Sequence, residues 1–187
     1  MSGKNGFSVR DMTLCALFAA LIAIGTFIRI PTPLLPLTLQ TLFVVLAGLT
    51  LGPRRGAGAV TIYVTAGLVG APVFTQGGGP GYVLNPTFGY IVAFIAGAWA
   101  AGWLGRPGAG FWRLALAGAA GIAVIYAAGI PYYYFVARYY MGRTLGAQTL
   151  IWTFVLMPLP GDLASCLVAA AIVRRLRALL PQLDQRP

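Results

Sequence analysis

Residues 30–56 read IPTPLLPLTLQTLFVVLAGLTLGPRRG, and this stretch decides which kind of fold the chain can adopt. Three prolines within six positions prevent residues 30–41 from continuing a helix. Apolar backbone that is not helical is tolerated at membrane depth only where it packs inside protein or lines a cavity. The apolar run at 38–51 predicts a short membrane span, which stops at Gly52-Pro53-Arg54-Arg55. The stretch therefore predicts a membrane helix preceded by a non-helical segment that the protein itself encloses.

The composition of the whole chain agrees with a membrane location. Of its 187 residues, 59% are hydrophobic and 9% are charged, and the mean hydropathy is +0.82. A soluble domain carries about a quarter charged residues, so this chain cannot cover a water-facing surface. Its apolar content and its two cysteines also exclude a disordered chain and a disulfide scaffold. We expect an all-α integral membrane protein in which residues 1–187 form a single membrane domain.

Long apolar runs separated by short polar or glycine-rich segments predict six transmembrane helices. The first run is too long for a cleavable signal and no small-residue cleavage site closes it. Residues 71–87 carry no charge and several glycines, which predicts either a lid over a pocket or a plain surface turn. The predicted spans are about 13–30, 38–51, 56–70, 87–105, 114–134 and 149–173.

Six spans put both termini on the same side of the membrane. That side would carry ten of the thirteen basic residues, so the positive-inside rule predicts cytoplasmic termini. The net charge of +10 then reflects topology and contact with the anionic headgroups of the lipid bilayer, and we expect no nucleic-acid partner. The ten are Lys4, Arg10, Arg54, Arg55, Arg106, Arg113, Arg174, Arg175, Arg177 and Arg186, and the other three are Arg29, Arg138 and Arg143.

Several residue types that catalysis requires are missing from the sequence. The chain has no His and no Glu, which excludes Ser-His-Asp catalysis and a His-ligated zinc site. The single lysine, Lys4, does not follow a phosphate-binding glycine loop, so the chain is not a P-loop ATPase. An intramembrane enzyme is disfavoured because a lone carboxylate has no second acid or base to work with. We expect neither an enzyme nor a resident metal or cofactor.

Asp162 is the one acidic residue inside an apolar run. A carboxylate at membrane depth is costly, so it usually marks a functional site. Asp162 precedes the basic end of its span by about 16 Å of helix, near mid-membrane. The alternative is structural, because Pro158 and Pro160 interrupt the helix and Asp162 could cap the segment that restarts there.

Two neutral amides, Gln40 and Asn85, also lie in apolar surroundings. Each can donate and accept hydrogen bonds, which suits an amide-like or urea-like ligand. Each could instead satisfy the broken backbone beside it. Together with Asp162, they predict one polar spot in an apolar pocket.

Alanines repeat at helical spacing along the first span. Ala16, Ala19, Ala20 and Ala23 form overlapping small-xxx-small patterns, which permit close approach of a neighbouring helix. The neighbour could be a partner protein or another helix of the same chain.

The stretch 30–56, followed by NPTFGY at 85–90 and PGD at 160–162, resembles the BioY family of biotin-specific substrate-binding (S) components of energy-coupling-factor (ECF) transporters. The resemblance covers most of the chain in the correct order. It implies a six-helix protein of a prokaryotic cytoplasmic membrane that captures biotin from outside with high affinity. It also implies partners: a transmembrane coupling subunit and two ATP-binding-cassette ATPases that supply energy.

The resemblance also implies roles for individual residues. Asp162 and Asn85 would hydrogen-bond the ureido ring of biotin, and Gln40 and Tyr90 would line the pocket. Ala16 and Ala20 would contact the coupling subunit.

One position departs from the family pattern. Ser165 stands where the family often has a lysine that pairs with the biotin carboxylate. The Ser165 hydroxyl, a water or another cation would then take over, or the carboxylate would stay near solvent. The candidate cations are Arg29, Arg138 and Arg143.

Two other functions remain open from the sequence. A proton-coupled secondary transporter could use Asp162 as its carboxylate, and its uptake would collapse with the proton gradient and persist without ATPases. An S component for a different vitamin would be distinguished by ligand competition.

Overall fold

The structure is a computed structural model that describes residues 8–32, 34–144 and 146–179, and these ranges are mostly helical. Three helical stretches are long and apolar enough to cross a membrane: 9–27, 111–140 and 147–179. The α-helices are α1 (Val9–Phe27), α2 (Gln40–Leu51), α3 (Pro53–Val69), α4 (Phe88–Leu104), α5 (Phe111–Phe135), α6 (Ala147–Ile151) and α7 (Leu159–Leu179). Shorter elements are the strands β1 (Arg29–Ile30) and β2 (Leu37–Thr38), a 3-10 helix (Pro80–Leu84) and two π-helical turns (Val136–Tyr140 and Trp152–Leu156).

The helix ends differ from the predicted spans where tertiary structure intervenes. The first helix ends at Phe27 rather than residue 30, because Arg29 and Ile30 pair with β2. Gly52, with φ of 83°, both ends α2 and precedes α3, whose first residue is Pro53 rather than residue 56. The π-helical turn after α5 carries that helical stretch to Tyr140, beyond the predicted end at 134.

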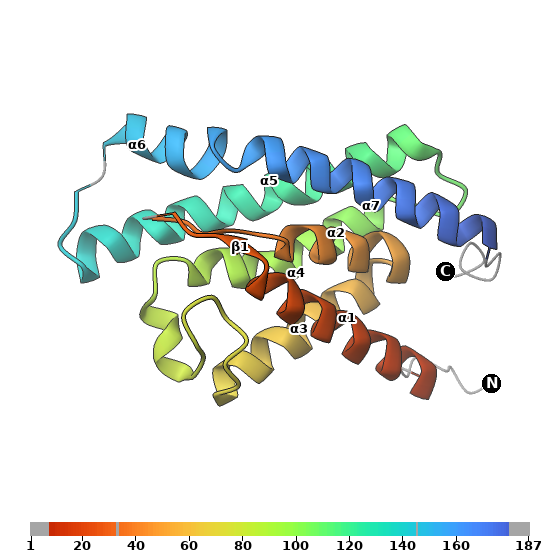
Figure 1. Cartoon of the computed structure of the whole chain (residues 1–187), viewed down its shortest axis with the longest axis horizontal. Helices are drawn as coiled ribbons and strands as arrows, with labels where there is room; N and C mark the ends of the chain where they lie inside the picture. Colours follow the sequence, from red (N-terminus) through yellow and green to blue (C-terminus); the bar gives the residue numbers. More distant parts are fainter. Residues whose placement is uncertain (1–7, 33, 145, 180–187) are drawn as a thin grey trace, which may run out of the picture.

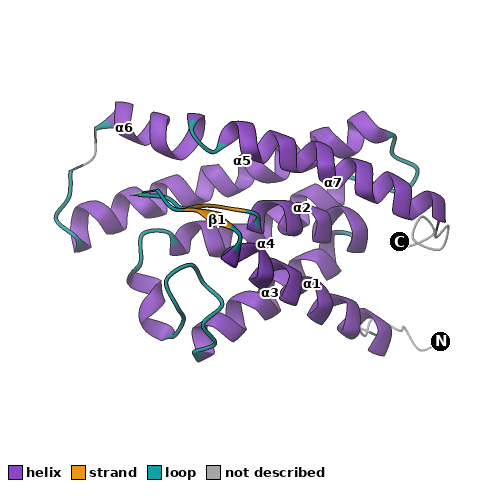
Figure 2. Cartoon of the chain, viewed as in Figure 1, coloured by secondary structure: helices purple, strands orange, loops and turns teal. Residues whose placement is uncertain are grey.

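Helix α2 lies at the centre of the bundle. It contacts α1, α3, α4, α5 and α7, and eight of its twelve residues are buried. In Figure 1, α5 and α7 run along one side of α2 and α4, and α1 and α3 run along the other. Figure 2 shows the two short strands beside the start of α2. Twelve helical residues span about 18 Å, so α2 alone is too short to cross a bilayer core of about 30 Å. The two strands before α2 extend this part of the chain beyond the helix.

Glycines allow α2, α3 and α4 to approach closely. A methyl group on Gly48 would overlap the carbonyl oxygen of Ala98 in α4, and one on Gly56 would overlap the backbone of Gly48. Gly102 of α4 lies against Gly48 and Gly52 in the same way. Close backbone contact provides van der Waals packing, which drives helix association in lipid.

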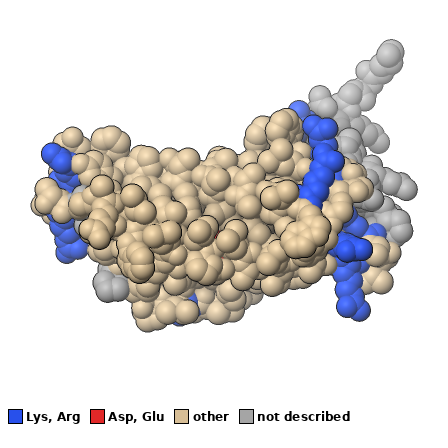
Figure 3. Space-filling model, turned by 90° about the horizontal axis from the view of Figure 1, so that it is seen from above, with Lys and Arg blue, Asp and Glu red and all other residues tan. Residues whose placement is uncertain are grey.

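On the face shown in Figure 3, lysine and arginine side chains gather at the two ends of the long axis, and the surface between them is largely uncharged. The start of α1 and the end of α7 lie at the same end of the molecule (Figure 1). There Arg55 pairs with Asp11 at 3.1 Å, and Arg177 donates to the carbonyls of Leu49 and Gly105 at 3.1 and 2.9 Å. Arg177 thereby satisfies carbonyls that the ends of α2 and α4 leave unpaired. Lys4 and Arg186, also predicted for this end, lie outside the described residues.

We expect Gly48→Ala to lower the free energy of unfolding by about 1–3 kcal/mol, because the added methyl meets backbone that cannot move aside. The denaturation midpoint of the detergent-solubilised protein measures the effect. Gly146→Ala is the matched control, because nothing lies within 4 Å of a methyl group there and its φ is −68°. Equal midpoints for both variants would contradict the close contact of α2 with α4.

Candidate ligand-binding site

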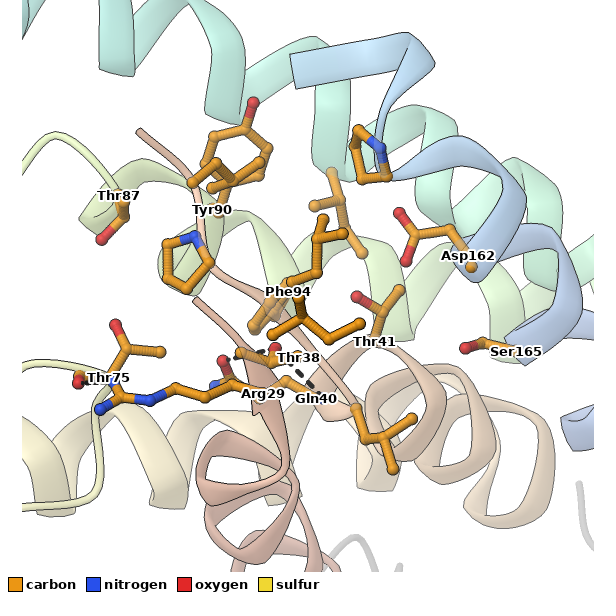
Figure 4. Close-up of a pocket in the computed structure, with 18 of the residues that line it drawn as sticks. Arg29, Thr38, Gln40, Thr41, Thr75, Thr87, Tyr90, Phe94, Asp162 and Ser165 are labelled. Atoms are coloured by element: carbon orange, nitrogen blue, oxygen red, sulfur yellow. Dashed lines mark hydrogen bonds between the residues drawn. The ribbon is translucent and has the colours of Figure 1, made fainter. Parts of the chain in front are cut away.

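A cavity of about 380 Å³ lies among the β1–β2 hairpin, the start of α2, the helices α4 and α5, and the start of α7. Its volume falls within the range of about 300–1,000 Å³ that is usual for small-molecule sites. The walls are largely apolar, with contributions from Leu35, Ile91, Phe94 and Ile125. Figure 4 shows the polar side chains that interrupt these walls. The arrangement fits a mostly apolar ligand with a few polar groups.

The proline-containing segment forms one wall of the cavity, as an antiparallel hairpin. Arg29 pairs with Thr38 and Ile30 with Leu37, and the Leu39 amide donates to the Ile28 carbonyl at 3.1 Å. The sequence-based expectation of non-helical backbone before α2 is confirmed. The hairpin satisfies part of its own backbone, which is what makes non-helical chain tolerable inside a membrane protein.

Gln40, the first residue of α2, joins the hairpin to α3. Its side-chain nitrogen donates to the Tyr63 hydroxyl at 2.7 Å, and its side-chain oxygen accepts from the Thr38 hydroxyl at 3.1 Å. Tyr63 donates in turn to the Val73 carbonyl at 3.1 Å. Gln40 lines the cavity and is 4% exposed. Its amide therefore orients the cavity wall through two side-chain hydroxyls, rather than through the neighbouring backbone. The role of Gln40 as a ligand residue stays a prediction.

Asp162 lies in the first turn of α7 with its carboxylate directed into the cavity (Figure 4). Helix α7 begins at Leu159 and the Asp162 amide donates to the Pro158 carbonyl at 3.0 Å, so Asp162 lies inside the helix rather than at its N-cap. One carboxylate oxygen accepts from the Tyr126 hydroxyl at 2.5 Å. Thr41 of α2 lies beside the carboxylate in the same cavity wall (Figure 4).

The partners of Asp162 are neutral. Within the described ranges, the one ion pair within 4 Å is Arg55 with Asp11, at the far end of the bundle. A carboxylate has about four lone-pair positions, so the Tyr126 hydroxyl leaves room for a ligand's N–H groups. The site can therefore offer charge-assisted hydrogen bonds to a donor-bearing ligand.

Tyr90 and Ser165 also line the cavity. Tyr90 is 6% exposed, and its hydroxyl has no hydrogen-bond partner among the described residues. A buried hydroxyl without a partner is costly, so it marks a place where a ligand or water can bind. Ser165 follows Asp162 by three residues along α7 and is buried.

Asn85 lies outside the cavity wall. Its side-chain nitrogen donates to Gln76 at 2.8 Å, and its side-chain oxygen accepts from the amide and hydroxyl of Thr87 at 3.0 and 2.8 Å. These bonds shape the turn that leads into α4, and Thr87 itself lines the cavity. The role of Asn85 as a ligand residue stays a prediction.

The glycine-rich loop before α4 is anchored by an aromatic residue. Phe74 is 2% exposed and packs against Tyr63, Tyr82 and Phe88. Thr75, the next residue, lines the cavity. The loop thus contributes one residue to the cavity while its neighbour fixes it to the bundle.

A model of the BioY family matches residues 1–182. The chain belongs to the BioY family. A probable biotin transporter BioY of Lysinibacillus sphaericus is 37% identical, over 90% of this chain and 87% of that protein. The biotin transporter BioY of Thermotoga maritima is 36% identical, over 91% of this chain and 98% of that protein. The crystal structure of an S-component for biotin from an ECF-type ABC transporter superposes with a TM-score of 0.79 at 25% identity, covering 95% of both chains.

The sequence shows no sign of two polar residues that lie beside Asp162 in this BioY-family cavity. Tyr126 of α5 bonds Asp162, which lies 36 residues later, and nothing in its apolar run distinguishes it. Thr41 adjoins Gln40, but its position relative to Asp162 depends on the packing of α2 against α7. Both residues become recognisable only when the helices are assembled.

Tyr63→Phe removes the hydroxyl that accepts from Gln40 and donates to the Val73 carbonyl. We expect a loss of about 1–3 kcal/mol in the free energy of unfolding, because two buried polar groups lose their partner. Denaturation in detergent measures this loss. Tyr140→Phe, at a residue 64% exposed, is the control and should have no effect. A Tyr63→Phe protein as stable as the control would show that the hydrogen bonds do not hold the hairpin to α3.

Proposed function

We propose that this chain captures biotin from the outer side of the cytoplasmic membrane as the S component of an ECF-type ABC transporter. The observation that carries the proposal is the Asp162 carboxylate, which faces an apolar cavity with neutral partners in a chain of the BioY family. Because members of the BioY family are transporter components, the chain is not an enzyme.

The chemistry of biotin matches the cavity. Its ureido ring carries two N–H donors, and a buried carboxylate supplies strong acceptors for them. Its thiophane ring and valeryl chain are apolar and suit walls such as Leu35, Ile91 and Phe94. The unpartnered Tyr90 hydroxyl is available to the same ligand. Asn85, Gln40 and Ser165 are proposed as further ligand residues, on the family resemblance and, for Gln40 and Ser165, on their place in the cavity wall.

We propose six membrane spans within one domain, residues 1–187, with both termini cytoplasmic. The support is the distribution of arginines. Arg54 and Arg55 lie in the first turn of α3, Arg106 and Arg113 flank the connection from α4 to α5, and Arg174 lies in the second half of α7. Figure 1 shows these segments at the same end of the molecule as the start of α1. Arg138 and Arg143 follow α5 at the opposite end. The short α2 reaches further across the membrane through the hairpin that precedes it.

Energy for transport comes from partner proteins in this proposal. The chain has no phosphate-binding loop, and the family resemblance implies two ATPases and a coupling subunit as partners. Ala16 and Ala20 are exposed on α1, whereas Ala19 is buried in the bundle. An exposed row of small residues permits close approach of another helix, so we propose this row as the contact with the coupling subunit.

Asp162→Asn should weaken biotin binding tenfold or more, because loss of a charged hydrogen-bond partner costs about 1.5–3 kcal/mol. Equilibrium binding of labelled biotin to the purified protein measures the change. Asp11→Asn is the matched control, because Asp11 pairs with Arg55 away from the cavity. Unchanged affinity in Asp162→Asn would remove Asp162 from the site.

Replacing Ala16 and Ala20 together with tryptophan should abolish ATP-dependent uptake and leave biotin binding unchanged, because bulky side chains separate the two helices. Uptake into proteoliposomes that contain the coupling subunit and both ATPases measures the effect. Ala96→Trp, on the exposed face of α4, is the control. Uptake that persists without the ATPases and collapses with the proton gradient would support the proton-coupled alternative instead.

A further inference from the structure

We propose that Arg29 binds the carboxylate of the ligand and so makes the cavity selective for an acid over its neutral amide. This inference rests on the proposed function, because it assigns a partner to the anionic end of biotin. On the α7 side of the cavity, the lining residues Asp162 and Ser165 offer this anionic end no positive charge.

Arg29 is the one basic residue among the described residues that line the cavity. It belongs to β1, and its guanidinium donates to the carbonyl of Thr75 in the loop before α4. Figure 4 places Arg29 and Asp162 on opposite sides of the cavity. The cavity is therefore negative on one side and positive on the other, with apolar walls between.

The guanidinium can hold a carboxylate without giving up its present partner. It carries five N–H donors, of which the Thr75 carbonyl takes one. Arginine pairs with carboxylates through two parallel hydrogen bonds, which a compact ammonium does not provide. Arg29 is exposed at the edge of the cavity, so its charge is not buried when the site is empty. A ligand carboxylate at the edge of the cavity would therefore bond Arg29, which already links the β1–β2 hairpin to the loop that contains Thr75.

Charge also argues against a carboxylate beside Ser165. Residues three apart on a helix lie about 5–6 Å from each other, so an anion at Ser165 would be close to the Asp162 carboxylate. Like charges at that distance repel, and the repulsion is stronger in apolar surroundings. The two charged sides of the cavity thus set one ligand orientation, with the N–H donors at Asp162 and the carboxylate at Arg29.

The other two candidate cations, Arg138 and Arg143, do not line the cavity. Arg138 donates to the Tyr134 hydroxyl at 2.8 Å and lies over the rings of Tyr134 and Tyr139. Both arginines belong to the connection after α5 and serve as controls for the general effect of positive charge at this end.

The test compares affinities of the purified full chain for biotin and for biotin carboxamide, which differ in charge at the anionic end. The wild-type chain should prefer the acid by about tenfold or more. Arg29→Gln should lose this preference by weakening biotin binding while carboxamide affinity stays within about threefold. Arg29→Lys should retain part of the preference, because the charge remains but the paired hydrogen bonds do not. The carboxamide also serves as the folding control, since a misfolded variant loses both ligands.

Three outcomes would overturn the inference while the proposed function stands. The first is a wild-type chain that binds biotin and carboxamide equally, and the second is an Arg29→Gln chain that keeps the acid preference. Arg138→Gln and Arg143→Gln should keep the wild-type preference, and the third outcome is its loss in either of these variants. A wild-type chain that binds neither ligand would instead refute the proposed function.

Discussion

Backbone that leaves the helix inside a membrane protein must find its hydrogen bonds within the protein, and the site of this chain depends on how residues 28–40 meet that requirement. The hairpin pairs part of its backbone with itself, and the Gln40 amide ties its base to Tyr63 and Thr38. Because the hairpin cannot pack as a helix would, space remains between it and α4, α5 and α7. The interruption of the helix therefore supplies both a cavity wall and the cavity.

The placement of charge around this cavity follows from the shortage of charge in the chain. Asp162 has a neutral hydroxyl partner in Tyr126, so its negative charge stays available to a ligand. An arginine beside Asp162 would form an internal ion pair with the carboxylate, which would then be less able to accept hydrogen bonds from a ligand. The ion pair of Arg55 with Asp11 lies instead at the end of the bundle where α1 begins. Recognition and structural pairing are thereby separated along the long axis of the molecule.

Tight packing at the centre and small residues on the outside serve different purposes. Gly48, Gly56 and Gly102 bring α2, α3 and α4 into backbone contact and hold the bundle together without polar groups. Ala16 and Ala20 expose a row of equally small side chains on α1. The same property of small residues, close approach, thus stabilises the interior and leaves a surface on which another helix can pack.

The sequence by itself determined the membrane class, the helical runs, the break at 30–41 and the family, because apolar length, proline and net charge act locally along the chain. It also pointed to Asp162, since a carboxylate in an apolar run is rare enough to stand out. Tertiary structure decided which residues meet. It brought Tyr126 and Thr41 to Asp162, placed Arg29 across the cavity, and engaged Asn85 in a turn outside the wall. These relations depend on packing between helices that are distant in sequence, and local patterns carry no record of that packing.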